Sequence, residues 1–305
     1  MNFLGHTFRK IDEMVLYQLH LRIPDSLEPS AWACLPFETV LAETQINVEK
    51  TAVSALTTSG EHPVWIGSLD EEMETRVSIR RAPNPNSPLI IYHHGLNEYP
   101  YTSSWRRIFD GLDDRYHLAC IQAPYHDNYI DPIAKGWATV NRMYQLFSGS
   151  LRMIELVKNR FEQEGAEETI LVGLSWGGLT AMLYEGIFQD LGFVVPMMSS
   201  PNLARVLIDS AELFNRPVSV PDDKIYELLD LTPYFERISP YKMHPLLGRF
   251  DGFFRFDSHV AQFEKRPLRT ISRGHLSTIW PGRLLREHVL SALEEAARKR
   301  VRTRE

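Results

Sequence analysis

Short apolar runs alternate with longer amphipathic segments along most of the chain from Pro88 onward, and this alternation limits the available folds. Such alternation is typical of βα units around a parallel sheet. Several of the runs are apolar throughout, as expected of strands that are buried on both faces. The sequence therefore predicts an α/β fold, with a mostly parallel central sheet and helices on both of its faces. The expected strands are 89–92, 117–122, 169–174, 193–198, 245–250 and 268–272, and the clearest expected helices are 103–112, 140–164, 179–189 and 283–298.

The first sixty residues precede this pattern, and three roles stay open for them: completing a pocket, forming an oligomer interface or extending the fold. Between Phe8 and Leu19, apolar residues recur at steps of three and four, which predicts an amphipathic packing helix over 8–23 that ends near Pro24. This helix is also a candidate interface for a homo-oligomer. The other elements expected before the parallel sheet are short strand pieces at 40–41 and 46–48 and a hairpin at 63–79.

One gap between predicted strands is much longer than the others. Residues 202–242 contain two helical patterns, at 203–214 and 223–235, and both are rich in apolar residues. Long insertions between core elements are commonly functional lids, so a helical cap is predicted here. Its apolar residues either cover the sheet or face a substrate. The expected organisation is an N-terminal extension (1–60), a first core part (61–201), the cap (202–242) and a second core part (243–305).

Composition argues against several classes of protein. The 39 acidic and 33 basic residues give a net charge of −6, which disfavours a general binder of nucleic acid or of anionic membranes. The two cysteines, Cys34 and Cys120, indicate neither a disulfide framework nor a Cys-based zinc site, and they fit a reducing compartment. The start of the chain lacks the continuous apolar core of a signal peptide, and no stretch approaches ~20 apolar residues. We therefore expect a cytoplasmic protein without a membrane span.

The clearest chemical signal is a G-x-S-x-G pattern with Ser175 at its centre, flanked by Gly173 and Gly177. Taken alone the pattern is weak, because chance would produce roughly 0.1 matches in a chain of this length. Its position is informative, because it follows the apolar run 169–172 and precedes the helical stretch from Leu179. This is the strand-turn-helix setting of a nucleophile elbow. The two glycines leave room for the neighbouring strand and helix in so tight a turn.

A serine nucleophile needs a general base. Four histidines follow Ser175 in the chain. His275 is the best candidate, because it follows the last predicted strand and precedes the final helix. The other three are expected to pack or to lie at the surface, since His244 precedes a predicted strand and both His259 and His288 lie in helical patterns.

The base in turn needs an orienting acid, expected between Ser175 and His275. Asp251 ends the predicted strand 245–250, and the residues that separate it from His275 leave room for one helix and one strand. Asp257 is the alternative, although it also reads as the N-cap of a helix beginning near Ser258. The sequence favours Asp251 and leaves Asp257 open.

An earlier predicted strand ends in His94 and Gly95. The order of strand, His-Gly, serine elbow, acid and histidine resembles the α/β-hydrolase superfamily over about 63–298. In that superfamily the oxyanion hole uses the amide of the residue after the nucleophile and one amide from the loop after the early strand. The resemblance therefore implies these roles for Trp176 and Leu96, and a bracing role for His94.

Further polar residues at 125–128 follow the strand 117–122 and should lie at the same edge of the sheet as the elbow. They either line a pocket or form a polar turn built on Asp127. No recognised metal-ligand spacing or phosphate-binding pattern is present, so neither a metal nor a cofactor is expected. The candidate pocket-lining residues are His94, Gly95, Tyr125 and His126.

Together these residues predict a serine hydrolase. Ser175 would attack an acyl substrate to form an acyl-enzyme, His275 would take and return the proton, and Asp251 would orient His275. Water would then release the acyl group. The expected partner is a small-molecule acyl compound with an apolar group, most simply a carboxylic ester. Because His275 must be neutral to act as a base, activity should fall below about pH 6.5 unless the pKa of His275 is shifted. Two alternatives stay open: an acyltransferase, thioesterase or non-hydrolytic lyase on the same scaffold, and a non-catalytic ligand-binding protein.

Overall fold

A computed structural model describes residues 3–20, 28–216 and 218–304. Its strands, in chain order, are β1 (Thr44–Ile46), β2 (Gly60–Ser68), β3 (Glu71–Arg80), β4 (Leu89–His93), β5 (His117–Ile121), β6 (Thr169–Leu174), β7 (Phe193–Met197), β8 (Leu246–Gly248) and β9 (Arg269–Ile271). Within these described ranges, nine strands form one sheet in the order β1-β2-β3-β5-β4-β6-β7-β8-β9. Strands β4 to β9 are parallel, and β1 to β3 add an antiparallel edge. The predicted mostly parallel α/β architecture is confirmed.

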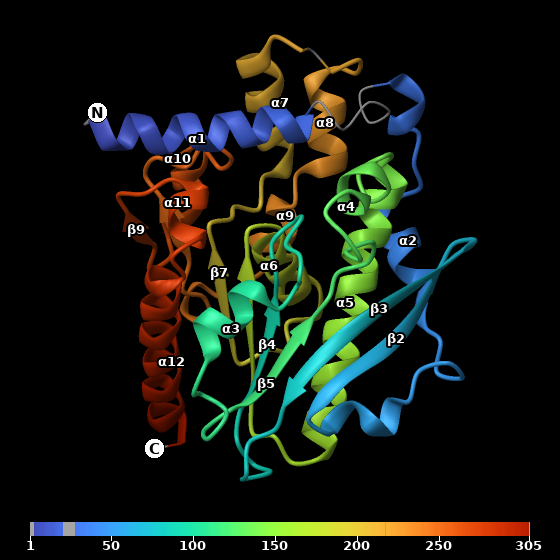
Figure 1. Ribbon diagram of the computed structural model, residues 1–305, viewed down its shortest axis with the longest axis vertical. Helices are drawn as coiled ribbons and strands as arrows, with labels where there is room; N and C mark the ends of the chain where they lie inside the picture. The colour runs from blue at the N-terminus through green and yellow to red at the C-terminus, as the bar shows by residue number, and fades with distance from the viewer. Residues whose placement is uncertain (1–2, 21–27, 217, 305) are drawn as a thin grey trace.

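The helices surround this sheet (Figure 1). They are α1 (Phe3–His20), α2 (Phe37–Ala42), α3 (Ser103–Phe109), α4 (Asp131–Ala134), α5 (Val140–Gln163), α6 (Trp176–Phe188), α7 (Leu203–Phe214), α8 (Asp222–Leu229), α9 (Thr232–Phe235), α10 (Phe256–His259), α11 (His275–Ile279) and α12 (Arg283–Arg304). Of the helices in the described part of the chain, none is long and apolar enough to cross a membrane.

Both faces of the sheet are buried under helices. Along β4, Leu89 and Ile91 pack with residues of α5 and α6, whereas Ile90 and Tyr92 pack with residues of α3 and α12. Successive side chains of a strand point to opposite faces, so a strand covered on both sides must be apolar throughout. This burial explains why the strand signals in the sequence are continuous apolar runs.

Two predictions for the N-terminal region need correction. Residues 40–41 were predicted as strand but belong to α2, where Val40 packs into the core. Two apolar residues are too few to distinguish a helix from a strand by periodicity. The helix predicted over 8–23 corresponds to α1, which begins at Phe3, and residues 21–23 lie outside the described residues.

The segment between β7 and β8 also departs from its prediction. The helix expected over 223–235 is divided into α8 and α9. The division occurs where the chain returns to the segment that follows β7. There the Leu231 amide donates to the Pro201 carbonyl at 3.1 Å, and Asp230 forms an isolated antiparallel bridge with Asn202. A new helix then starts with Pro233 in its first turn, a position where proline is tolerated.

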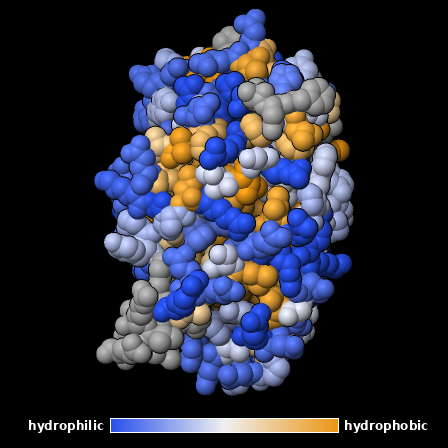
Figure 2. All heavy atoms as spheres, turned by 90° about the vertical axis from the view of Figure 1, so that its left-hand side faces the viewer, coloured by the Kyte–Doolittle hydropathy of each residue, from blue (hydrophilic) through white to orange (hydrophobic). Residues whose placement is uncertain are grey.

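The surface mixes polar and apolar side chains. Figure 2 shows the side of the molecule that lies to the left in Figure 1, with hydrophobic patches between hydrophilic ones. Apolar atoms contribute more than half of a typical folded surface, so this mixture alone marks no site. The site is instead identified from the residues at the carboxyl ends of the parallel strands.

Candidate active site

Ser175 lies in the sharp turn between β6 and α6. Its backbone has φ 53° and ψ −114°, a conformation that non-glycine residues rarely adopt and that is concentrated at functional sites. Space explains the flanking glycines. A Cβ on Gly173 would lie 2.1 Å from the Gly177 carbonyl oxygen, and a Cβ on Gly177 would lie 2.1 Å from the His93 carbonyl oxygen. The turn therefore holds the serine at the N-terminus of α6, where free amides and the positive helix dipole favour negative charge.

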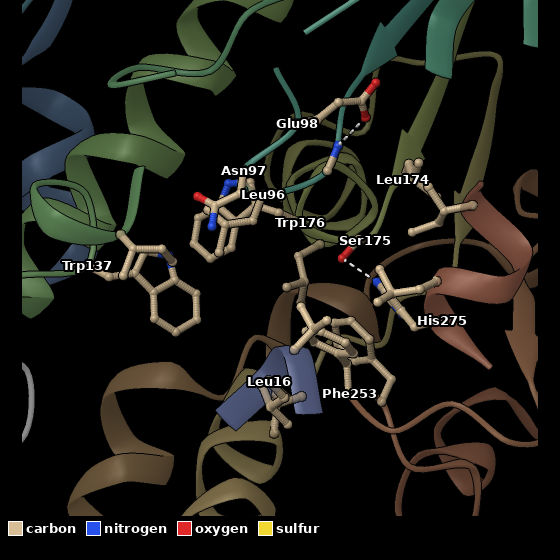
Figure 3. Close-up of a pocket in the computed structure, with 18 of the residues that line it drawn as sticks. Leu16, Leu96, Asn97, Glu98, Trp137, Leu174, Ser175, Trp176, Phe253 and His275 are labelled. Carbon is tan, nitrogen blue, oxygen red and sulfur yellow. Dashed lines mark hydrogen bonds between the residues drawn. The ribbon is translucent and has the colours of Figure 1, made fainter. Parts of the chain in front are cut away.

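The structure brings Ser175, His275 and Asp251 together in one chain of hydrogen bonds, and Figure 3 shows the bond between Ser175 and His275. The His275 Nε2 atom lies 3.0 Å from the Ser175 Oγ atom, and its Nδ1 atom lies 2.7 Å from the Asp251 Oδ2 atom. An ionised carboxylate can only accept a hydrogen bond, so Nδ1 carries the proton and Nε2 is left to accept from the serine hydroxyl. This is the arrangement that a nucleophile, a general base and an orienting acid require.

The surroundings of Asp251 and His275 hold both side chains in place. The Asp251 Oδ1 atom accepts the backbone N–H groups of Phe253 and Phe254, each at 2.8 Å. The rings of these two phenylalanines stack on the imidazole, with centroids 4.6 and 5.9 Å away. Burial alone would lower the pKa of His275, but the charge and hydrogen bond of Asp251, together with the charge of Asp12, raise it above its ordinary value.

The remaining candidates for acid and base lie elsewhere. Asp257 is exposed in the first turn of α10, and the N-cap of this helix is Arg255 rather than Asp257. The other downstream histidines have separate partners: His244 Nδ1 pairs with Glu295 at 2.5 Å, His259 with the Ser200 hydroxyl at 2.9 Å, and His288 with the His244 carbonyl at 3.0 Å.

The loop after β4 lies beside the nucleophile. A Cβ on Gly95 would be only 3.6 Å from the Ser175 Cβ atom, and both Leu96 and Trp176 line the adjoining cavity. Glu98 ties this loop to the start of α3, because it accepts the Gly95 N–H at 3.4 Å and the Ser104 N–H at 2.6 Å. Burial raises the pKa of Glu98. The amides expected to form an oxyanion hole thus belong to segments that lie next to Ser175.

His94 braces the same loop from below. Its Nε2 atom accepts the Ala123 N–H at 3.0 Å, and its Nδ1 atom lies 2.8 Å from the Gly95 carbonyl oxygen. The ring of His126 lies 4.6 Å from that of His94, and burial lowers the pKa of both histidines. Tyr125 donates to Glu71 at 2.8 Å and lines a separate cavity. Of the four candidate pocket-lining residues, the cavity at Ser175 is lined by Gly95 but not by the other three.

A cavity of about 370 Å³ opens beside Ser175 and His275 (Figure 3). Most of the side chains that line it are aliphatic or aromatic, and more than half of these come from the loop after β4 and from α1, α6, α7 and α11. Tyr99, Tyr129 and Trp280 also line it and are 43%, 57% and 59% exposed, so the cavity reaches the surface beside these rings. Its volume and apolar lining are those of a site for a small organic molecule.

Three residues of α1 belong to this site, whereas the sequence left open whether the first sixty residues complete a pocket. Val15 and Leu16 line the cavity, and Figure 3 shows Leu16 reaching it from α1. Asp12 is buried against the loops of Asp251 and His275. One signal was available: Asp12 follows Phe8 by four residues and precedes Val15 by three, so a carboxylate interrupts an apolar helical stripe.

No cluster of three or more His, Cys, Asp or Glu side chains that could hold a metal ion occurs among residues 3–20, 28–216 and 218–304. The buried histidines at the end of β4 and in the loops after β4 and β5 make hydrogen bonds to backbone groups.

The sequence matches no protein-family model and no curated protein. Solved structures do resemble it. Acetyl xylan esterase 1 from a Thermoanaerobacterium species is 12% identical with a TM-score of 0.58, over 91% of this chain and 98% of that chain. Est1E from Butyrivibrio proteoclasticus is 13% identical with a TM-score of 0.55, over 76% and 99% of the two chains. An esterase from Pyrococcus furiosus is 15% identical with a TM-score of 0.55, over 79% and 91%. Together with the strand order, these likenesses establish that the chain has the α/β-hydrolase fold.

Proposed function

We propose that this protein is a serine hydrolase that cleaves a carboxylic ester through an acyl-enzyme intermediate. The observation that supports this most strongly is the hydrogen-bond chain from Ser175 through His275 to Asp251. It occurs at a strained turn beside an apolar cavity. A protein that only binds a ligand would need neither the strain nor the aligned base. Two of the similar solved structures are esterases, which fits the same reaction class.

In the proposed reaction, the Ser175 Oγ atom attacks the ester carbonyl while His275 Nε2 takes the hydroxyl proton. Asp251 keeps the imidazole in the required tautomer and stabilises its positive charge. The amides of Leu96 and Trp176 donate to the oxyanion of the tetrahedral intermediate. His275 then gives its proton to the departing alkoxide, and an activated water molecule releases the acid by the same steps.

The lining of the cavity supports an apolar group on the substrate. Burial of each CH₂ group in such a site contributes about 0.8 kcal/mol, which corresponds to about a fourfold rise in kcat/KM. We also propose that residues 202–242 act as a cap on the core, because Leu203, Val206 and Leu207 of α7 line the cavity. Residues 1–60 would be an extension that completes the pocket through Val15 and Leu16.

The proposal is tested by intact mass after exposure to a fluorophosphonate, which phosphonylates activated serines. We expect one adduct on the wild type and none on Ser175→Ala. The matched control is Ser210→Ala, because Ser210 also lines the cavity and its hydroxyl donates to the Leu207 carbonyl oxygen, at 2.8 Å. This control should form the adduct. A folded wild type that stays unmodified, or a Ser175→Ala variant that is still modified, would refute the proposal.

If the adduct forms, p-nitrophenyl esters of graded chain length should be hydrolysed, with the rate rising as the acyl chain lengthens to the size of the cavity. Product analysis in the presence of an added alcohol distinguishes hydrolysis from transfer. Release of the free acid in excess over the new ester would support a hydrolase. The opposite ratio would identify an acyltransferase.

A further inference from the structure

Helix α1 packs directly against the two loops that carry Asp251 and His275. Figure 1 shows it running horizontally through the upper part of the view, above α10 and α11. Gly252 follows Asp251 and Gly274 precedes His275, and both glycines face Asp12. A Cβ on Gly252 would lie 2.7 Å from the Asp12 Cβ atom, and one on Gly274 would lie 2.6 Å from its Oδ2 atom. Gly274 has φ −86°, which any residue adopts, so the close approach of α1 is what requires a glycine there.

The Asp12 carboxylate connects these two loops. The side chain is buried, with the residue 0% exposed. Its Oδ2 atom accepts the backbone N–H of His275 at 2.6 Å and that of Gly252 at 3.0 Å, and its Oδ1 atom accepts the N–H of Leu276 at 3.0 Å. One rigid group therefore fixes the start of α11 relative to the residue that follows Asp251. Gly274, the N-cap of α11, has no side chain to cap these amides, and Asp12 caps them instead.

A carboxylate in this position is costly. Burial, and then the negative charge of Asp251, raise the pKa of Asp12 to about 6, while the charge of His275 and the backbone hydrogen bonds act in the opposite direction. Two carboxylates thus flank one imidazole, Asp251 at its Nδ1 atom and Asp12 behind its backbone. A neutral residue would avoid the desolvation of a charge, so the acid indicates a demand beyond packing. Other charged groups nearby are the Lys10–Glu13 pair on α1 and Arg273, which lies over the Phe8 ring.

We propose that Asp12 is a positioning residue: it holds the Asp251 loop and His275 in register and adds negative charge behind the imidazolium that forms during the reaction. The inference rests on the proposed hydrolase function. Without Asp12, the direct link between the start of α11 and Gly252 is lost, while the Phe250 N–H still donates to the Arg273 carbonyl oxygen at 3.0 Å. The 2.7 Å and 3.0 Å hydrogen bonds of His275 then lose their alignment. A misplacement of about 1 Å can cost about 100-fold in rate.

The first test is Asp12→Asn, which keeps the size of the side chain but removes its charge and one acceptor oxygen. We expect kcat for a p-nitrophenyl ester to fall about 10- to 100-fold with KM nearly unchanged, because alignment acts on the chemical step. The acid limb of the pH profile of kcat/KM should move to lower pH, because the charge of Asp12 contributes to the raised pKa of His275. The matched control is Glu13→Gln, the neighbouring acid on α1, which should keep the wild-type rate and profile.

A second variant changes the other partner of the contact between Asp12 and Gly274. Gly274→Ala leaves the Asp12 carboxylate intact but places a methyl group 2.6 Å from Asp12 Oδ2, so the carboxylate must shift. It should lower kcat in the same way as Asp12→Asn. Circular dichroism and thermal unfolding would show whether each variant remains folded, so a loss of rate is not confused with unfolding.

A readout that needs no turnover separates this inference from the proposed function. The proton shared by His275 Nδ1 and Asp251 should give a low-field NMR resonance in the wild type. Asp12→Asn should shift or broaden it and lower the pH at which His275 titrates. If these NMR changes occur in a protein that neither reacts with a fluorophosphonate nor hydrolyses esters, Asp12 is a positioning residue and the hydrolase proposal fails. An unchanged resonance and titration in Asp12→Asn overturn the inference, whether or not the wild type is active.

Discussion

Replacing Asp251 by asparagine should abolish most activity without disturbing the fold. In the structure, Asp251 Oδ1 accepts the amides of Phe253 and Phe254, and Oδ2 accepts Nδ1–H of His275. Asparagine can keep its oxygen on the two amides, which places its NH₂ group against His275. That group donates and cannot accept, so His275 must present an unprotonated Nδ1 atom and carry its proton on Nε2. The imidazole can then no longer take the proton of Ser175.

This change of tautomer determines how much kcat should fall. In a serine protease, the corresponding substitution leaves the geometry intact and lowers kcat about 10,000-fold, equivalent to about 5.5 kcal/mol in the activation barrier. We expect a loss of the same order here, with KM changed little. The midpoint of thermal unfolding should change little, because the two backbone hydrogen bonds of the loop are kept.

The assay is kcat and KM for a p-nitrophenyl ester, together with the rate of fluorophosphonate labelling. Asp257→Asn is the matched control, since it makes the same change at the exposed acid six residues further along the chain. It should retain the wild-type rate within about twofold. An Asp251→Asn variant that keeps more than a tenth of the wild-type kcat would refute the reasoning, as would an equal loss in Asp257→Asn.

Three further predictions follow from the geometry of the site. Because the charge and hydrogen bond of Asp251 and the charge of Asp12 together outweigh the burial of His275 and raise its pKa, kcat/KM should be half-maximal above about pH 6.5 and fall at lower pH; a flat profile from about pH 5 to 8 would contradict this. Glu98→Gln should lower kcat about tenfold by loosening the loop at Gly95, and an unchanged kcat would show that the loop needs no such tie. Leu207→Trp should narrow the cavity and shorten the preferred acyl chain of p-nitrophenyl esters, with about fourfold lost per excluded CH₂ group; an unchanged preference would remove α7 from the substrate pocket.

Local sequence determined much of the core. Strands β4 to β7 were predicted within one residue at each end, because strands buried on both faces are apolar at nearly every position. The turn at Ser175 could also be predicted from the sequence. Its glycines are required by close contacts within the same strand-turn-helix unit and with the neighbouring strand. The break between α8 and α9 could not be predicted from the sequence, because it depends on hydrogen bonds from residues 230–231 to residues 201–202, which follow β7.

The sequence identified fewer of the relations between residues at the site. The sequence alone narrowed the histidine to His275 by its place after the last strand, but it left two acids open, and only the fold determines that Asp251 lies against the imidazole while Asp257 is exposed. Asp12 could be seen as an acid in an apolar stripe, yet nothing local indicated its partner, which is 263 residues away in the chain. Strands and turns follow from the contacts of neighbouring residues. The role of a buried charged side chain depends on which groups the tertiary structure places around it.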